Sequence, residues 1–366
     1  MNHGVRERIL SFDMIRTVAA LAVFTYHFSL SSGTSVFPTS FLSLQDGLGF
    51  VAVSVFFMLS GASLYYTYEK KLSVCDFDSI RQYYIKRARA IYPPFYAVFF
   101  ALHILRAIKY RSFFYLGKKA VFLLSLVGLD GYFSYETKTY YLVGEWFLGA
   151  LILIYLMFPL LLYVFQKSQL ITTAALGAIY LLTINKRMLS PAPNANIISC
   201  LLSFETGMLL IYMIRRGERD SEDHADHAQI KRDHKHVSVV TALSAIILIA
   251  AVCITDLLYG LNRSLTGHLY ALGVFMLLYI VGILPETGPG FVKSFFKNFS
   301  EASYLFFLIH HVILEKICRH MNAGRGDVWI LLFWYIGSLV IVYWMARILT
   351  SVIRSCAAYF AKTCTE

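Results

Sequence analysis

Long apolar stretches, separated by shorter polar or basic segments, make up most of this chain. A helix needs about 20 apolar residues to cross a hydrocarbon core about 30 Å thick. On this basis we predict ten membrane-crossing helices, at 12–32, 47–68, 92–105, 141–165, 170–184, 196–214, 237–257, 266–284, 301–319 and 328–350. A further apolar run, 120–129, is too short to cross and is interpreted as a re-entrant or interfacial segment. The pattern predicts an all-α fold, a polytopic transmembrane helix bundle of about 10 (10–11) spans.

The positions of Lys and Arg predict the orientation of the chain. Basic residues are concentrated on the cytoplasmic side of membrane proteins. They occur in residues 1–10, in 69–91 and in the hydrophilic stretch 215–236, so we expect both termini and a hydrophilic loop at 215–236 to be cytoplasmic. The basic segment 106–119 falls on the opposite side in this arrangement. We expect residues 1–366 to form a single integral membrane domain, with the first helix acting as its own insertion signal rather than a removable signal peptide.

Composition agrees with a membrane protein and argues against other classes. The chain of 366 residues is 58% hydrophobic and 15% charged, whereas soluble domains average about 25% charged residues. Its net charge of +11 comes mostly from loops beside the apolar spans, which favours a lipid bilayer as partner and no nucleic acid. The six Cys include no C-x-x-C pair, and we expect no metal site.

The first apolar stretch, SFDMIRTVAALAVFTYHFSL, contains three ionisable residues, Asp13, Arg16 and His27. Eleven positions separate Arg16 from His27, which on a helix is three turns plus about 20°, so they share one face about 16 Å apart. Ionisable side chains inside a membrane usually face a protein interior or a wet cavity and mark a functional site. The alternative is a structural Asp13–Arg16 ion pair and a hydrogen-bonded packing His.

Other polar residues near the spans have two readings each. The stretch KRARAIYPPFY contains three cations, Lys86, Arg87 and Arg89. They suit a polyanionic ligand, or they anchor the chain on the cytoplasmic side. The two prolines that follow are expected near the start of a helix. Ser60, with Gly61, lies where small residues allow close helix approach, although its hydroxyl could also serve a pocket.

Histidines occur in two further groups. His310 and His311 lie midway along an apolar span and point about 100° apart, so we expect at most one to face a given cavity. The four His of the 215–236 insert have no recognised metal spacing and are interpreted as part of a solvated loop, with a metal site as the alternative.

Five blocks, in order, resemble the integral membrane acyltransferase 3 family. SFDMIRTVAALAVFTYH is similar to its first helix, which carries an Arg and a His separated by ten residues. The other blocks are FVAVSVFFMLSG, KRARAIYPPFY, EWFLGALILIYLMFPLLL and SYLFFLIHHVIL, and together they extend from residue 11 to about 315.

The resemblance implies an O-acyltransferase that moves an acyl group, commonly acetyl, from acetyl-CoA or another acyl-CoA to a hydroxyl of a carbohydrate or glycan acceptor. Arg16 and His27 match the first-helix pair required for activity, and His310 matches the late-helix His. Arg87 and Arg89 match the basic motif thought to meet the acyl donor, and Lys86 beside them is the third cation expected to bind its phosphates. The substrate-pocket candidates are Asp13, Ser60, Glu145, Trp146 and Tyr155.

Departures from the family pattern bear on the acceptor. Leu151 stands where many members have Glu, Ala90 where many have Arg, and His311 where one branch often has Pro. The Leu151 variant resembles the branch that acts on polysaccharides such as exopolysaccharide. The resemblance also implies a multi-pass protein of a bacterial cell (plasma, or inner) membrane.

The expected chemistry is coherent with these residues. A neutral imidazole suits a general base that acts on the attacking hydroxyl, so His27 is expected to be that base or a transient acyl carrier. The alternative function is a transporter or flippase for a sugar or lipid-linked glycan, with the same residues as its pathway. Such proteins often show internal repeats with broken helices, and we find no convincing repeat.

Overall fold

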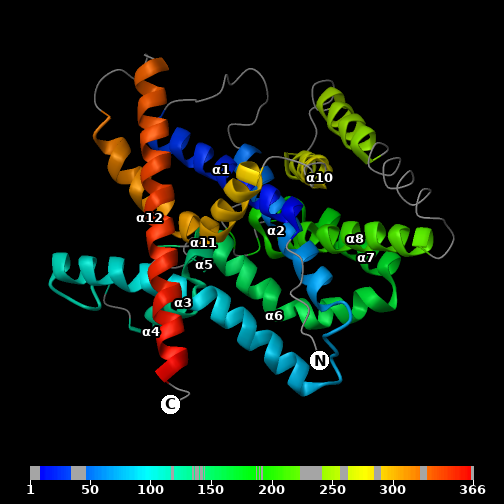
Figure 1. Ribbon diagram of the computed structural model, residues 1–366, viewed down its shortest axis with the longest axis horizontal. Helices are drawn as coiled ribbons and strands as arrows, with labels where there is room; N and C mark the ends of the chain where they lie inside the picture. The colour runs from blue at the N-terminus through cyan, green and yellow to red at the C-terminus, as the bar shows by residue number, and fades with distance from the viewer. Residues whose placement is uncertain are drawn as a thin grey trace.

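The structure, a computed structural model, is a bundle of α-helices (Figure 1). It describes residues 9–33, 47–116, 119–133, 136, 140, 143, 145–186, 188, 190, 193–222, 241–255, 263–283, 290–321 and 328–363. Within these ranges the secondary structure is helical, with no strand. The predicted all-α helical membrane bundle is therefore confirmed.

All ten predicted spans coincide with helices. They are α1 (Leu10–Ser32), α2 (Gly47–Tyr68), α3 (Phe77–Tyr110), α6 (Glu145–Lys167), α7 (Gln169–Thr183), α8 (Ile197–Glu222), the helix Thr241–Thr255, α10 (Arg263–Ile283), α11 (Gly290–Arg319) and α12 (Val328–Thr363). Six of them, α2, α3, α6, α8, α10 and α12, are long and apolar enough to cross a membrane by length and composition. The number of crossings stays a prediction.

Two short helices fill the connection between α3 and α6. They are α4 (Lys119–Val127) and α5 (Asp130–Phe133), and a 3-10 turn, η1 (Pro193–Ala195), precedes α8. With nine residues, α4 is about 14 Å long, too short to cross the bilayer. This agrees with the interpretation of 120–129 as a segment that does not cross.

The start of the third span was wrongly predicted. Pro93 and Pro94 lie inside α3, which begins sixteen residues before them at Phe77. The Asp76 side chain accepts a hydrogen bond from the backbone N–H of Asp78 and caps that earlier start. Proline removes the N–H that would bond to the carbonyl four residues earlier, here at Arg89 and Ala90. Both of these residues are exposed, so their carbonyls can be solvated instead.

The hydrophilic insert begins as helix. α8 continues to Glu222, so the first eight residues of 215–236 belong to it. The four insert histidines lie outside the described residues, as does the loop 34–46.

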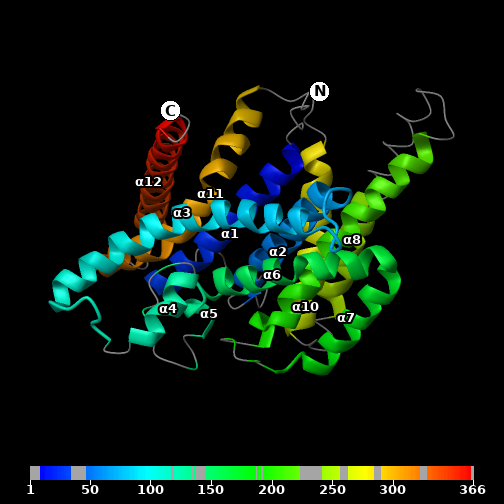
Figure 2. The ribbon, with the colours of Figure 1, turned by 90° about the horizontal axis from the view of Figure 1, so that it is seen from below.

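α1 occupies the centre of the bundle and packs against α2, α10 and α11 (Figures 1 and 2). Arg16 contacts Ser300 of α11, and eleven residues later His27 contacts His310 of the same helix. The two helices therefore run in the same direction. In Figure 2 the beginnings of α1 and α11 and the end of α12 lie on one side of the bundle, and α4 and α5 lie on the other.

Candidate functional site

Three histidines meet where α1 packs on α11. The ring centroid of His27 lies 5.0 Å from that of His310 and 5.2 Å from that of His311. The expectation that at most one of the adjacent histidines faces the site is therefore wrong. His27 projects between two side chains that diverge by about 100°, so both rings reach it. Sequence reasoning missed His311, and the signal for it was its place beside His310.

His310 is held in one tautomer by the backbone of α11. Its Nδ1 lies 2.6 Å from the carbonyl oxygen of Phe307, which can only accept, so Nδ1 carries the proton and Nε2 has the free lone pair. His310 is buried, whereas His27 is half-buried. Nε2 of His310 and Nδ1 of His27 are both buried and lack a hydrogen-bond partner among the described residues.

Arg16 is bound by two helices at the other end of the same interface. Its Nη1 donates to Ser300 Oγ at 3.0 Å and lies 4.0 Å from Oδ1 of the buried Asp13. Arg16 and His27 thus both face α11, as their spacing predicted. An ion pair with Asp13 and a contact to α11 coexist, so neither alternative reading of Arg16 is excluded.

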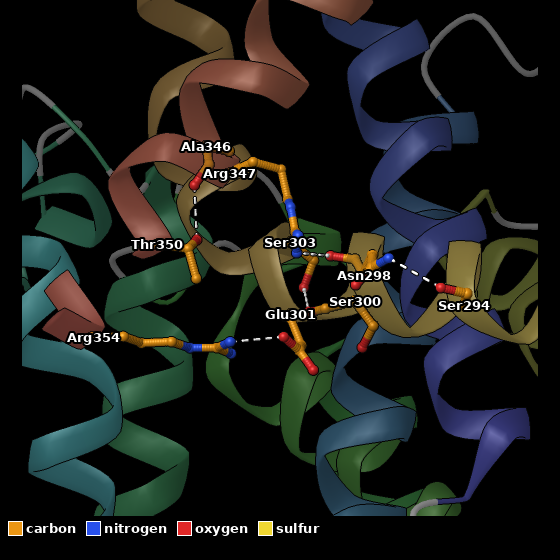
Figure 3. Close-up of polar contacts among 9 residues, drawn as sticks. All are labelled: Ser294, Asn298, Ser300, Glu301, Ser303, Ala346, Arg347, Thr350 and Arg354. Atoms are coloured by element: carbon orange, nitrogen blue, oxygen red, sulfur yellow. Dashed lines mark hydrogen bonds and ion pairs between the residues drawn. The ribbon is translucent and has the colours of Figure 1, made fainter. Parts of the chain in front are cut away.

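α11 is fixed at the level of Ser300 from its other side by α12. Arg347 donates to the carbonyl oxygen of Asn298 at 3.2 Å, and Arg354 pairs with the Glu301 carboxylate at 2.7 Å (Figure 3). Ser303 Oγ donates to the carbonyl of Ser300 within α11. The turn that contacts Arg16 is therefore held in place by two arginines of α12.

The basic run on α3 does not present one face. Arg87 is half-buried, with its guanidinium carbon 5.8 Å from the centre of the Tyr68 ring and 6.0 Å from that of Tyr155, in cation–π contact. Lys86 and Arg89 are exposed, because they lie about 100° and 200° around the helix from Arg87. The structure brings Arg87 together with Tyr155 and leaves the other two cations outside.

The level of Arg87 in the bundle can be read from its neighbours. Tyr68 ends α2, and Tyr66 of the same turn contacts Phe12 at the beginning of α1, with ring centroids 6.2 Å apart. Arg87 therefore lies near the first turns of α1, and His27 lies fifteen residues after Phe12, about 22 Å along that helix.

The remaining candidates lie on α2 and α6. Ser60 is half-buried next to Gly61, and Trp146 is half-buried at the start of α6, whose neighbour Phe147 contacts Phe307 of α11 at 5.1 Å. Glu145 begins α6, and its side chain lies outside the described residues. No group of three or more His, Cys, Asp or Glu in the described part of the chain has an arrangement that could hold a metal ion.

These positions define two polar centres at different levels of the bundle. The histidine cluster holds imidazole lone pairs of the kind that general bases use, and Arg16 on α1 and Arg87 on α3 place positive charge nearer the beginning of α1. This arrangement can bind an anionic donor at one end and remove a proton at the other.

Comparisons with known proteins place the chain in a family. No curated protein and no solved structure matches it. A family profile described as an acyltransferase domain matches residues 9–347, which include every helix from α1 to α11 and most of α12. The chain therefore belongs to the acyltransferase 3 family.

Proposed function

We propose that this membrane acyltransferase transfers an acetyl group from acetyl-CoA to a hydroxyl of a cell-envelope polysaccharide or exopolysaccharide, in the cytoplasmic membrane of a bacterial cell. Family membership supports acyl transfer in general. The observation that carries the proposal is the cluster of His27, His310 and His311 between α1 and α11.

The donor enters from the cytoplasmic side in this proposal. Coenzyme A carries several phosphate charges, and Arg87 lies at the level of the first turns of α1, next to Tyr68 and Tyr155. A guanidinium binds phosphate oxygens in bidentate fashion. Arg16 is the next cation along the route towards His27. The exposed Lys86 and Arg89 attract the donor before it reaches Arg87.

His27 acts as the general base. The acceptor oxygen attacks the thioester carbonyl carbon, a C–O bond forms and the C–S bond breaks. His27 takes the proton of the hydroxyl and returns it to the departing thiolate of coenzyme A. A protonated His27 has a second N–H, and the Nε2 lone pair of His310 is available to accept it. This pairing supports His310 as the group that stabilises the charged base.

The test is transfer of labelled acetyl from acetyl-CoA to envelope glycans of the host by the purified protein in liposomes. His27→Ala removes the base, so we expect the rate to fall about 10²-fold or more. Arg16→Ala should also impair transfer. The control is His320→Ala, because His320 is exposed just after α11 and should leave the rate unchanged.

The outcomes separate the alternatives. Labelled protein that forms without acceptor and needs His27 would show that His27 carries the acyl group covalently. Absence of transfer with every acyl donor and glycan, together with glycan movement across the bilayer, would overturn the proposal in favour of a transporter.

A further inference from the structure

Four exposed cations gather where α3 ends and α4 begins. We name Arg106, Lys109, Arg111 and Lys119 the α3–α4 basic patch. None of them forms an ion pair with a carboxylate of the described residues, unlike Arg215, Arg319 and Arg354, which pair with glutamates. Unpaired exposed cations attract an anionic partner.

Aromatic rings, rather than carboxylates, contact the two lysines of the patch. The Lys109 ammonium lies 5.6 Å from the centre of the Tyr110 ring, and the Lys119 ammonium lies 5.7 Å from that of Phe114. Burial raises the pKa of Tyr115, and the nearby Arg106 guanidinium partly offsets that rise. A cation held over a ring keeps its charge available to an outside ligand, because the ring does not neutralise it.

Arg111 has a backbone conformation that most residues avoid. It caps the C-terminus of α3 with φ 51° and ψ 31°, in the left-handed region, and its N–H donates to the carbonyls of the last turn. Glycine is the usual residue at such a cap, and a non-glycine residue there costs about 1 kcal/mol. Because strained backbone is often found at functional sites, the presence of arginine at this position suggests that its guanidinium has a function.

The patch lies on the side of the bundle opposite to the beginnings of α1 and α11 (Figure 2). In the proposed orientation this is the outer side, where Lys and Arg are normally depleted. Donor phosphates approach from the other side, and Arg106 lies about 28 Å along α3 from Arg87. In this orientation an anionic ligand of the patch would come from the outer side of the membrane.

The surface around the cations is aromatic, with an unsatisfied polar group beneath it. The Tyr110 side chain is 56% exposed and that of Phe113 is 49% exposed. Below them, Tyr140 is 1% exposed, its ring centroid is 5.1 Å from that of Tyr115, and its hydroxyl has no hydrogen-bond partner among the described residues. Exposed rings beside cations suit a ligand that alternates flat apolar faces with acidic groups.

The patch connects to the histidine cluster through packed helices. α4 leads into α5, whose Tyr132 packs on Gly149 of α6. Phe147, two residues earlier on α6, contacts Phe307, whose ring lies 5.7 Å from that of His310. A long chain bound at the patch would thus rest on the elements that pack beside the proposed base.

We propose that the α3–α4 basic patch binds the acceptor and that the acceptor is an acidic polysaccharide. Its acidic groups pair with the four cations, and its sugar rings pack on Tyr110 and Phe113. This inference rests on the proposed function, which supplies the carbohydrate acceptor. It adds the charge of that acceptor and a place where it binds before transfer.

The test measures binding without catalysis, so it can fail or succeed independently of acyl transfer. The full-length protein in phosphatidylcholine nanodiscs is titrated with labelled alginate oligosaccharides, which are polyuronates, and with neutral dextran oligosaccharides of equal length. The patch variant combines Arg106→Gln, Lys109→Gln, Arg111→Gly and Lys119→Gln. Glycine adopts the left-handed conformation of position 111 without strain, so Arg111→Gly removes the charge and keeps the helix cap.

The matched control is Lys186→Gln, an exposed cation of the loop after α7, outside the patch. We expect alginate to bind more tightly than dextran, and binding to weaken with added salt. In the patch variant Kd should rise about tenfold or more, as expected for four exposed ion pairs of ordinary strength. In the control it should change less than about twofold.

Three results would overturn the proposal. The first is equal binding of alginate and dextran, and the second is an unchanged Kd in the patch variant. The third comes from a repeat in nanodiscs that contain phosphatidylglycerol: a difference in Kd between wild type and patch variant that appears only in those nanodiscs. The last would identify the patch as an anchor for anionic lipid headgroups. Normal thermal stability of the patch variant shows that it is folded.

Discussion

At the scale of single residues, Ser300 determines where the Arg16 guanidinium lies. The Arg16 side chain is 35% exposed, and the 3.0 Å bond to Ser300 Oγ ties it to α11. Ser300 is itself fixed by the surrounding contacts of α11 with α12 in Figure 3. A small hydroxyl thus positions a long flexible cation.

Ser300→Ala should weaken transfer without unfolding the protein. A hydrogen bond to a charged group is worth about 1.5–3 kcal/mol, so its loss should lower kcat/KM about tenfold or more. The effect should appear mainly in KM if Arg16 holds the donor. The control is Ser294→Ala, on the same helix but exposed. Unchanged kinetics in Ser300→Ala would show that Arg16 does not need this contact.

Asp130 provides a pH-dependent contribution to stability outside the spans. Burial raises the pKa of Asp130 to about 6, although Oδ1 accepts a hydrogen bond from the Gly131 N–H at 2.9 Å. The folded state then binds a proton more tightly than the unfolded chain does. This proton stabilises the fold most below about pH 4, and the contribution is lost as pH rises through about 6.

Asp130→Asn should abolish that dependence. We expect the melting temperature of the variant relative to wild type to increase between pH 4 and pH 7, because only the wild type pays for ionising a buried carboxyl. Thermal unfolding in detergent at several pH values measures this. Asp78→Asn, at an exposed position, serves as control. A parallel pH profile for wild type and Asp130→Asn would contradict the assignment.

At the scale of elements, α2 and α8 approach each other closely at a pair of glycines. A Cβ added at Gly61 would lie 1.9 Å from the carbonyl oxygen of Phe204, and one at Gly207 would lie 1.9 Å from that of Met58. The close helix approach predicted for this small-residue stretch is thus observed at Gly61, and the role of Ser60 stays a prediction. The sequence could not identify the partner helix, because many helices have small residues.

Gly61→Ala should destabilise the bundle, because the new methyl group meets backbone that cannot rotate away. Overpacking of this kind costs about 1–3 kcal/mol and should lower the melting temperature by several degrees. Gly177→Ala is the control, since a Cβ there meets nothing within 4 Å. It should be neutral or slightly stabilising, because alanine favours helix. Equal melting temperatures for the two variants would contradict the reciprocal glycine contact.

Element prediction succeeded where apolar length was decisive and failed where local capping competed with it. The apolar run alone suggested a third span from 92 to 105, but the cap at Asp76 starts α3 earlier and places two prolines inside it.

For the candidate site, the shared face of Arg16 and His27 followed from helix geometry. The meeting of His311 with His27 did not, because it depends on how α1 and α11 are rotated against each other.

At the scale of the whole molecule, the parallel packing of α1 and α11 constrains the topology. Successive crossings alternate in direction, so two helices that cross in the same direction have an odd number of crossings between them. The predicted ten spans place α1 first and α11 ninth, with seven crossings between them, in agreement with their parallel packing. In this predicted arrangement the exposed Cys75 is expected in the cytoplasm and Lys119 on the outer side.

Accessibility of single cysteines tests this orientation. In a background whose other cysteines are replaced, a membrane-impermeant maleimide should label Lys119→Cys in intact spheroplasts. It should label Cys75, and likewise the exposed Cys356, only after permeabilisation. Labelling of Cys75 before permeabilisation would reverse the orientation and place the α3–α4 basic patch in the cytoplasm.

In the proposed mechanism, the pairing of α1 with α11 limits how a substrate reaches His27 and His310. The two helices touch at Arg16 with Ser300 and again at His27 with His310, so a slide of one turn, about 5.4 Å, would break both contacts at once. We therefore expect α1 and α11 to move together as one unit rather than to separate. We expect an acceptor to reach the half-buried His27 from beside the α1–α11 pair, and we expect the neighbouring helices to move aside for it.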